Sequence, residues 1–170
     1  MILVIIFTRT RTSATTTVLF FRSFISVDDP ALVSRGEGMQ IITNNPMVKE
    51  KIKSCPVEFI DGTYADVFKE TKRLVVEERL VILTHPLSGS IKPNETYYKS
   101  ILITTTQLQQ IDMESLDLID NALDVYEKFN KNRKTPQWTP QILEDFADID
   151  LDLIENALSR IRFSPELRFK

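Results

Sequence analysis

Short apolar runs alternate with longer amphipathic segments through the middle of the chain. Four runs, at residues 40–43, 57–60, 80–83 and 100–104, are rich in Ile, Val and Leu. The last two are apolar along their length rather than alternating in polarity, which is typical of strands covered on both faces, as in a parallel α/β sheet. We therefore predict four strands at these positions.

Helix signals stand between the first three runs. Asn45 and Pro46 are a favoured N-cap and a residue that the first helical turn tolerates, so they predict a helix over 47–53. A turn at 61–63 precedes residues 64–78, whose apolar positions recur at helical spacing. The order strand, helix, strand, helix, strand, loop, strand predicts a doubly wound α/β domain with a mainly parallel sheet and flanking helices.

The C-terminal third contains an internal repeat. The sequence LDLIDNAL at 116–123 returns as LDLIENAL at 151–158. Each copy predicts an amphipathic helix, and a further short helix is predicted over 140–147. Such helices can cover the sheet or pair with a partner, including a second copy of the chain. The domain organisation we predict is an α/β domain at 39–130 with a helical extension at 131–170 packed on it.

Residues 1–38 have a different composition. They contain several Arg, Ser and Thr, and no acidic residue precedes Asp28. The segment fits neither a secretory signal nor a transit peptide well. The residues RGEG at 35–38 can be encoded by a purine run of the kind that binds ribosomes ahead of a bacterial start codon. We expect this leader to be disordered, or not to be translated natively, with Met39 as the start.

Composition and charge exclude several classes of function. With 42% hydrophobic and 26% charged residues the chain is typical of a globular protein, and its net charge of −3 argues against nucleic-acid binding. The apolar runs are too short to span a bilayer, so no membrane association is expected. The single cysteine, Cys55, excludes an intramolecular disulfide. Neither a Walker A loop nor a G-x-G-x-x-G motif occurs, and we expect no cofactor and no bound metal.

A polar loop between residues 83 and 100 is the strongest candidate for a site. It contains the only histidine of the chain. In doubly wound sheets ligands bind beyond the carboxyl ends of the strands, so segments 43–45, 61–63 and 84–99 should converge. The candidate ligand-binding residues in these segments are Asn44, Asn45, Asp61, Gly62, Thr84, His85, Ser88, Gly89, Ser90, Lys92, Asn94, Glu95 and Lys99.

These residues allow more than one chemistry. His85 follows a predicted strand and can be a general acid or base, or it can be hydrogen-bonded to the loop it shapes. The segment 88–90 with Lys92 and Lys99 can bind an anion through N–H groups, hydroxyls and charge, or it can be a turn with solvated lysines. The acidic run near the C-terminus lacks EF-hand spacing and predicts a solvated face. That run contains Glu144, Asp145, Asp148, Asp150, Asp152 and Glu155.

Three segments of the chain resemble the GrdX family. They read ITNNP at 42–46, FIDG at 59–62 and LTHPLSGSIKPNETYYKSI at 83–101, and the resemblance extends over about residues 39–129. Members of this family are small bacterial proteins that accompany the selenium-dependent glycine reductase system of anaerobes. The resemblance implies a cytoplasmic accessory protein of glycine, sarcosine or betaine reduction, with reductase subunits as candidate partners. It brings no established catalytic residue.

Three functional hypotheses follow. The first is a noncatalytic accessory protein that holds a small anionic ligand at the converging loops. The second is a small enzyme that uses His85 with Asp61 or Glu95 on a phosphorylated or acyl substrate. The third is an interaction module whose repeated helices bind a reductase subunit or a second copy of the chain.

Overall fold

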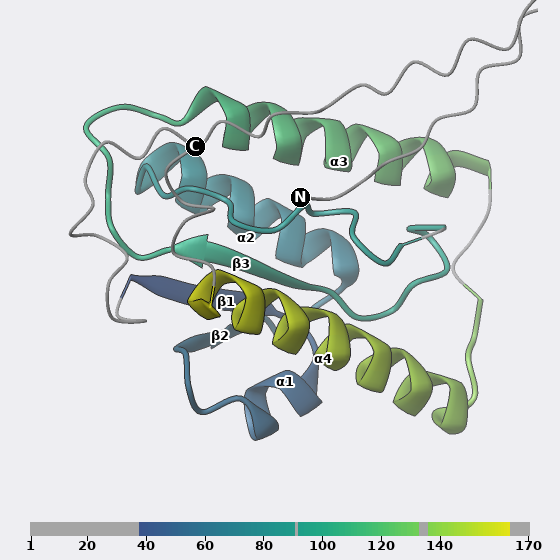
Figure 1. The fold of residues 1–170 in the computed structure, drawn as a ribbon. Coiled ribbons are helices and arrows are strands. Elements are labelled where there is room, and N and C mark those ends of the chain that lie inside the picture. Colours follow the sequence, from purple (N-terminus) through teal and green to yellow (C-terminus); the bar gives the residue numbers. More distant parts are fainter. Residues whose placement is uncertain (1–37, 91, 133–135, 164–170) are drawn as a thin grey trace, which may run out of the picture.

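A three-stranded mixed sheet lies at the centre of the molecule (Figure 1). The computed structural model describes residues 38–90, 92–132 and 136–163. Its strands are β1 (Met39–Thr43), β2 (Val57–Phe59) and β3 (Ser100–Thr104), in the order β2-β1-β3. β1 pairs in parallel with β2 and antiparallel with β3. The predicted α/β class is thus confirmed, as are the strands at 40–43 and 100–104.

The prediction of a doubly wound, mainly parallel sheet is wrong, because β3 is antiparallel and residues 80–83 form no continuous strand. Only Ile82 makes a bridge, antiparallel to Ile103 of β3. Side-chain hydroxyls replace ladder partners here: Val81 N donates to Thr104 Oγ1, and Ile82 N donates to Ser115 Oγ, each at 2.9 Å. Val81 and Ile82 are both buried, and hydroxyls satisfy their backbone donors.

Helices α1 (Pro46–Lys51) and α2 (Tyr64–Glu77) begin where their caps predict. The Asn45 side chain accepts from Met47 N at 2.9 Å. At the start of α2, Asp66 accepts from the hydroxyl and the N–H of Thr63, and these hydrogen bonds lower the pKa of the Asp66 carboxyl to about 2. α1 ends two residues before the predicted position and α2 one residue before it, so local capping fixed the starts better than the ends.

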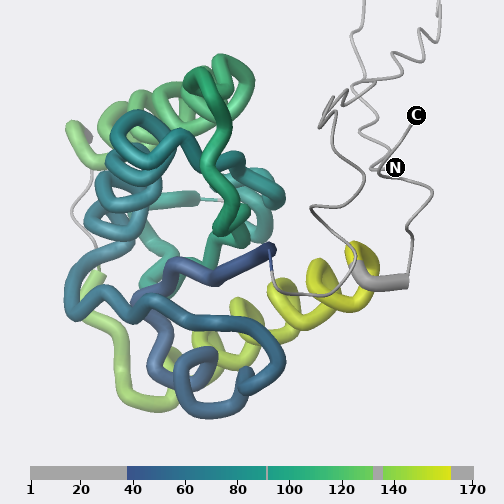
Figure 2. The backbone as a smooth tube through the Cα atoms, turned by 90° about the vertical axis from the view of Figure 1, so that its left-hand side faces the viewer, coloured from purple at the N-terminus to yellow at the C-terminus, as the bar shows by residue number. Residues whose placement is uncertain are grey.

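The repeated sequences form α3 (Met113–Asn132) and α4 (Pro140–Phe163), and they cover opposite faces of the sheet. α2 and α3 lie on one face and α1 and α4 on the other (Figure 1). In the side view of Figure 2, green α3 and yellow α4 are separated by purple β1. The predicted short helix over 140–147 is the first part of the continuous α4.

Two hydrophobic clusters explain this arrangement. One contains Ile42, Ile101 and Ile103 of the sheet with Ile119 of α3, and the other contains Met39, Ile41 and Leu102 with Leu151 of α4. Successive residues of a strand point to opposite faces, so a strand buried on both faces must be apolar at every position. The two repeats supply one apolar stripe to each cluster; their residues are Leu116, Ile119, Leu123 and Tyr126 on α3, and Leu151, Ile154, Leu158 and Ile161 on α4.

The predicted leader lies outside the described residues apart from Gly38. The division of the chain at residue 130 stays a prediction. Within the described residues, no helix combines the length and the apolar character needed to cross a membrane.

Candidate functional site

The Asn44 side chain joins the three segments that were predicted to converge. Its Nδ2 donates to Gly62 O at 3.2 Å and to Tyr97 O at 3.1 Å, and its Oδ1 accepts from Lys99 N at 2.8 Å. The three segments converge for a different reason from the one predicted. Because β3 is antiparallel to β1, the residues that enter β3, rather than those that leave it, lie beside the carboxyl end of β1.

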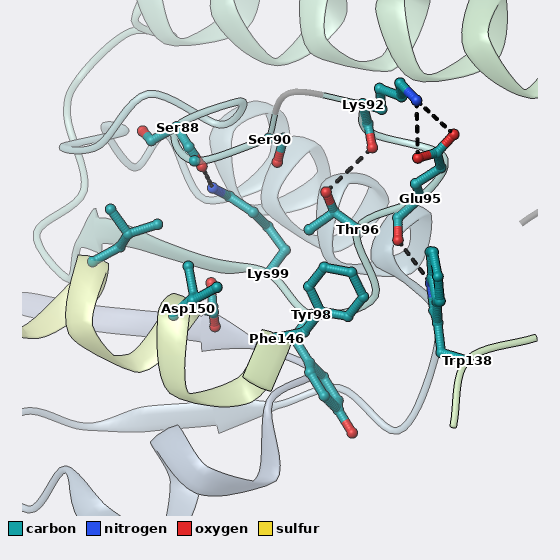
Figure 3. A pocket seen from close by; sticks show the side chains of 13 residues that line it. Ser88, Ser90, Lys92, Glu95, Thr96, Tyr98, Lys99, Trp138, Phe146 and Asp150 are labelled. Carbon is teal, nitrogen blue, oxygen red and sulfur yellow. Dashed lines mark hydrogen bonds and ion pairs between the residues drawn. The ribbon is translucent and has the colours of Figure 1, made fainter. Parts of the chain in front are cut away.

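A pocket of about 380 Å³ lies between the loop at residues 88–99 and the first half of α4 (Figure 3). Six of the predicted ligand-binding residues line it: Ser88, Gly89, Ser90, Lys92, Glu95 and Lys99. The other lining residues, which the sequence analysis did not single out as a site, are Thr96, Tyr98, Trp138, Phe146, Ile149, Asp150 and Leu153. The wall is mostly apolar, with a polar loop on one side.

Lys99 provides a buried amine in this wall. Its side chain is 4% exposed, and Nζ donates to Ser88 O at 2.7 Å. That is its single hydrogen bond, and it makes no salt bridge with any of the described residues. Burial lowers the pKa of the Lys99 amine from 10.5 to about 8, against the opposing effect of the Asp150 charge. Within the part of the chain that the structure describes, this ammonium group thus has no direct counterion.

Asp150, which lines the pocket, connects α4 to the edge of the sheet through hydrogen bonds. Its Oδ1 accepts from Ser100 N at 2.9 Å, and its Oδ2 accepts from Ser100 Oγ at 2.7 Å and from Asn45 Nδ2 at 3.0 Å. Asn45 also donates to Ala147 O at 2.8 Å. The start of β3, the start of α1 and the middle of α4 therefore share one buried hydrogen-bond network.

The prediction of a solvated acidic face is wrong for Asp150, which is 7% exposed. The residue lies on the same side of α4 as Ala147, Leu151 and Ile154, all of which are buried. This position on the apolar stripe was the signal available in the sequence. The remaining acidic residues of the run are exposed, as predicted: Glu144, Asp145, Asp148, Asp152 and Glu155.

Polar groups also form the rim of the pocket around Lys92 and Glu95. Lys92 pairs with Glu95 at 3.2 Å, and Glu95 O accepts from Trp138 Nε1 at 2.9 Å (Figure 3). Trp138 packs edge-on against Phe146, with ring centroids 5.6 Å apart. Trp138 stands between two prolines and was not among the predicted site residues. A large aromatic residue in such a segment was the local sign that the segment contacts the rest of the protein.

Ser90 connects the pocket to the core through Tyr64. Their hydroxyl oxygens are 2.7 Å apart. Burial raises the pKa of Tyr64, so the phenol keeps its proton and can donate to Ser90 Oγ. In that arrangement the Ser90 hydroxyl is left to donate into the pocket.

His85 does not line the pocket. It is exposed, and its Nδ1 accepts from Leu87 N at 3.1 Å. Partial desolvation, with the Lys99 charge, lowers the pKa of the His85 imidazole. These contacts match the alternative in which the histidine shapes its own loop, and the catalytic role of His85 stays a prediction.

The other predicted site residues also lie off the pocket wall. Thr84 Oγ1 accepts from Leu102 N at 2.9 Å, so it supports the sheet. Asp61 and Gly62 lie exposed in the turn before α2. The Asn94 side chain is 1% exposed, and neither of its polar atoms has a hydrogen-bond partner among the described residues. A direct ligand contact by any of these residues stays a prediction.

Gly89 brings the loop close to Leu153 of α4. Its φ is +74°, and a Cβ at this position would clash with Leu153 Cδ1. We expect Gly89→Ala to lower the free energy of unfolding by about 1–3 kcal/mol, through left-handed backbone strain and the clash. Urea denaturation of Gly89→Ala, Leu153→Ala and the double variant measures the two causes separately. The loss of unfolding free energy caused by Gly89→Ala should be smaller, but not zero, when residue 153 is alanine. An equal loss in both backgrounds would exclude the Leu153 clash as a cause.

Metal-ligand geometry and sequence similarity further define the site. Among the residues that the structure describes, no group of three or more His, Cys, Asp or Glu side chains is placed to hold a metal ion. No curated protein and no solved structure matches the chain. A family model described as GrdX-like protein matches residues 40–159, from the second residue of β1 through most of α4. Because this match covers more than half of the chain and agrees with the resemblance in the loop, the protein belongs to the GrdX-like protein family.

Proposed function

We propose that this protein is a ligand-binding accessory protein of the glycine, sarcosine and betaine reductase system, and that it holds a small organic anion in the pocket between the 88–99 loop and α4. Membership of the GrdX-like family supports the link to the reductase system. The observation that carries the ligand proposal is the buried Lys99 amine, which among the described residues has one hydrogen bond, to a neutral carbonyl, and no salt-bridge partner.

The cost of burying Lys99 is the reason to expect an anion. Removing an ammonium group from water is unfavourable unless a charge or several hydrogen bonds compensate for it. Asp150 acts on Lys99 through space, but its oxygens already accept from Ser100 and Asn45. A ligand carboxylate or similar anion next to Nζ would supply the missing partner, with Ser90 as an additional donor.

The apolar wall limits the kind of anion. Trp138, Phe146, Ile149 and Leu153 line the same pocket, and burial of apolar surface favours a ligand with a hydrocarbon portion. The alternative function, an enzyme with His85 as acid or base, has less support because the His85 imidazole is outside this wall. We therefore place the ligand at Lys99 rather than at His85.

A thermal-unfolding experiment tests the ligand proposal. We expect isocaproate to stabilise the full chain and its neutral amide, isocaproamide, not to; at 100 times its Kd a ligand adds about 2.7 kcal/mol. The stabilisation should be absent from Lys99→Met and should weaken as the pH rises through about 8, where the Lys99 amine loses its proton. Equal shifts for the acid and the amide would overturn the anion proposal.

The partner is tested separately. Immobilised full-length protein should retain purified glycine reductase subunits, and a charge-matched protein of another family is the control. Retention of no subunit, with or without isocaproate, would remove the reductase system from the proposal and leave the pocket unaffected.

A further inference from the structure

We propose that Lys99 is a nucleophile that forms a reversible Schiff base with a small α-oxo acid bound in this pocket. The proposal rests on the proposed function, because it uses the same site and the same negative charge on the ligand. It adds a covalent step and names the substrate class.

The first step of the argument is the position of the amine. Lys99 Nζ is directed toward Ser88 on the loop side of the pocket (Figure 3). Phe146 and Leu153, which also line the pocket, belong to α4. The backbone of Lys99 is fixed by the hydrogen bond from its N–H to Asn44 Oδ1. A lysine amine has three hydrogens, and Nζ makes one hydrogen bond among the described residues, so the rest of the group is free to face a ligand.

The second step is the state of the amine. A permanent cation would hold an anion more simply, and arginine serves that purpose in proteins. A desolvated lysine in an apolar pocket is instead a means of keeping the nucleophilic, neutral form accessible near neutral pH. With its pKa lowered from 10.5 to about 8, Lys99 has roughly 300-fold more neutral amine at pH 7 than a solvated lysine.

The reaction is balanced without a further reagent. The neutral amine attacks the carbonyl carbon, the C–N bond forms, and the carbonyl oxygen leaves as water. Counted from the protonated amine, one ammonium and one carbonyl give one iminium and one water, with no oxidation or reduction. The positive charge therefore stays at the nitrogen, where it faces the adjacent carboxylate of the oxo acid.

The third step is the match between pocket and ligand class. An α-oxo acid carries its carboxylate next to the reacting carbon, so one end of the ligand satisfies both the charge and the nucleophile at Lys99. The Ser90 hydroxyl can donate to the same end, and the hydrocarbon tail can lie against Phe146, Ile149 and Leu153. A pocket of about 380 Å³ is large enough for such a molecule.

Borohydride trapping tests the proposal on the full chain. Incubation with α-ketoisocaproate and sodium borohydride should give one reduced adduct, which peptide mass spectrometry places on Lys99 at least about 10-fold above any other lysine. The adduct should be lost in Lys99→Met and retained in Lys53→Met, a variant of an exposed lysine that does not line the pocket. α-Hydroxyisocaproate, which lacks the carbonyl, should give no adduct.

The outcomes separate this proposal from the proposed function. If isocaproate stabilises the protein but α-ketoisocaproate leaves no adduct on Lys99, the Schiff base is overturned and the anion site stands. If isovaleraldehyde, which has no carboxylate, labels Lys99 as fast as the oxo acid does and no anion stabilises the protein, the α-oxo acid class is overturned. Labelling spread evenly over the exposed lysines also overturns the proposal.

Discussion

Replacement of Asp150 by alanine is expected to lower the free energy of unfolding by about 3–5 kcal/mol. The variant loses the acceptor for Ser100 N, Ser100 Oγ and Asn45 Nδ2, all of which are buried. Each buried donor left without a partner costs about 1–3 kcal/mol. Urea denaturation followed by circular dichroism measures the change, and because the network joins α4 to β3, the variant should also lose the ligand pocket.

Asp152→Ala is the matched control for this prediction. It removes a carboxylate from the same helix two residues away, at an exposed position. Its cost should stay within about 0.5 kcal/mol, as for most surface substitutions. Asp150→Asn should also be destabilising, because the amide nitrogen would face hydrogen-bond donors. If Asp150→Ala were no less stable than Asp152→Ala, the buried network would not be a determinant of stability.

Replacement of Lys99 by methionine is expected to stabilise the protein by about 2 kcal/mol at neutral pH. The burial of Lys99 lowers the pKa of its amine from 10.5 to about 8, so the native state disfavours the charged form. Methionine fills similar space without a charge, at the cost of the hydrogen bond to Ser88 O. A residue whose removal stabilises the fold is what a ligand-binding role predicts.

The pH dependence of the stability difference between Lys99→Met and the original protein identifies the cause of that difference. Between about pH 8 and 10.5 the unfolded chain binds a proton at Lys99 that the native chain has released, so the stability of the original protein rises with pH in this window. The extra free energy of unfolding of Lys99→Met should therefore have its full value below about pH 8 and disappear by about pH 10.5. The Asp150 charge acts on Lys99, the Lys99 charge acts on His85, and Asp150 and His85 are present in both proteins compared. A difference that is constant from pH 7 to 10.5 would contradict the burial of a charged amine.

Local sequence was sufficient to predict the elements whose signals are local. The cap at Asn45 and the turn at 61–63 placed the starts of α1 and α2, since both signals act on residues next to them in the sequence. The apolar run at 100–104 predicted a strand buried on both faces, as observed. The loop between residues 83 and 100 was predicted to be a site because its polar residues are close in sequence, and six of them line the pocket.

Tertiary structure decided what depends on partners far along the chain. A continuous apolar strand is equally suited to parallel and antiparallel pairing, so the sequence did not determine the direction of β3, nor that hydroxyls would replace a ladder at Val81 and Ile82. Asp150 is buried because its partners, Ser100 and Asn45, stand 50 and 105 residues away. By itself the sequence determined the local elements and the loop chemistry. Only the fold placed the apolar face of α4 against that loop, because hydrogen bonds and contacts between distant segments have no local pattern.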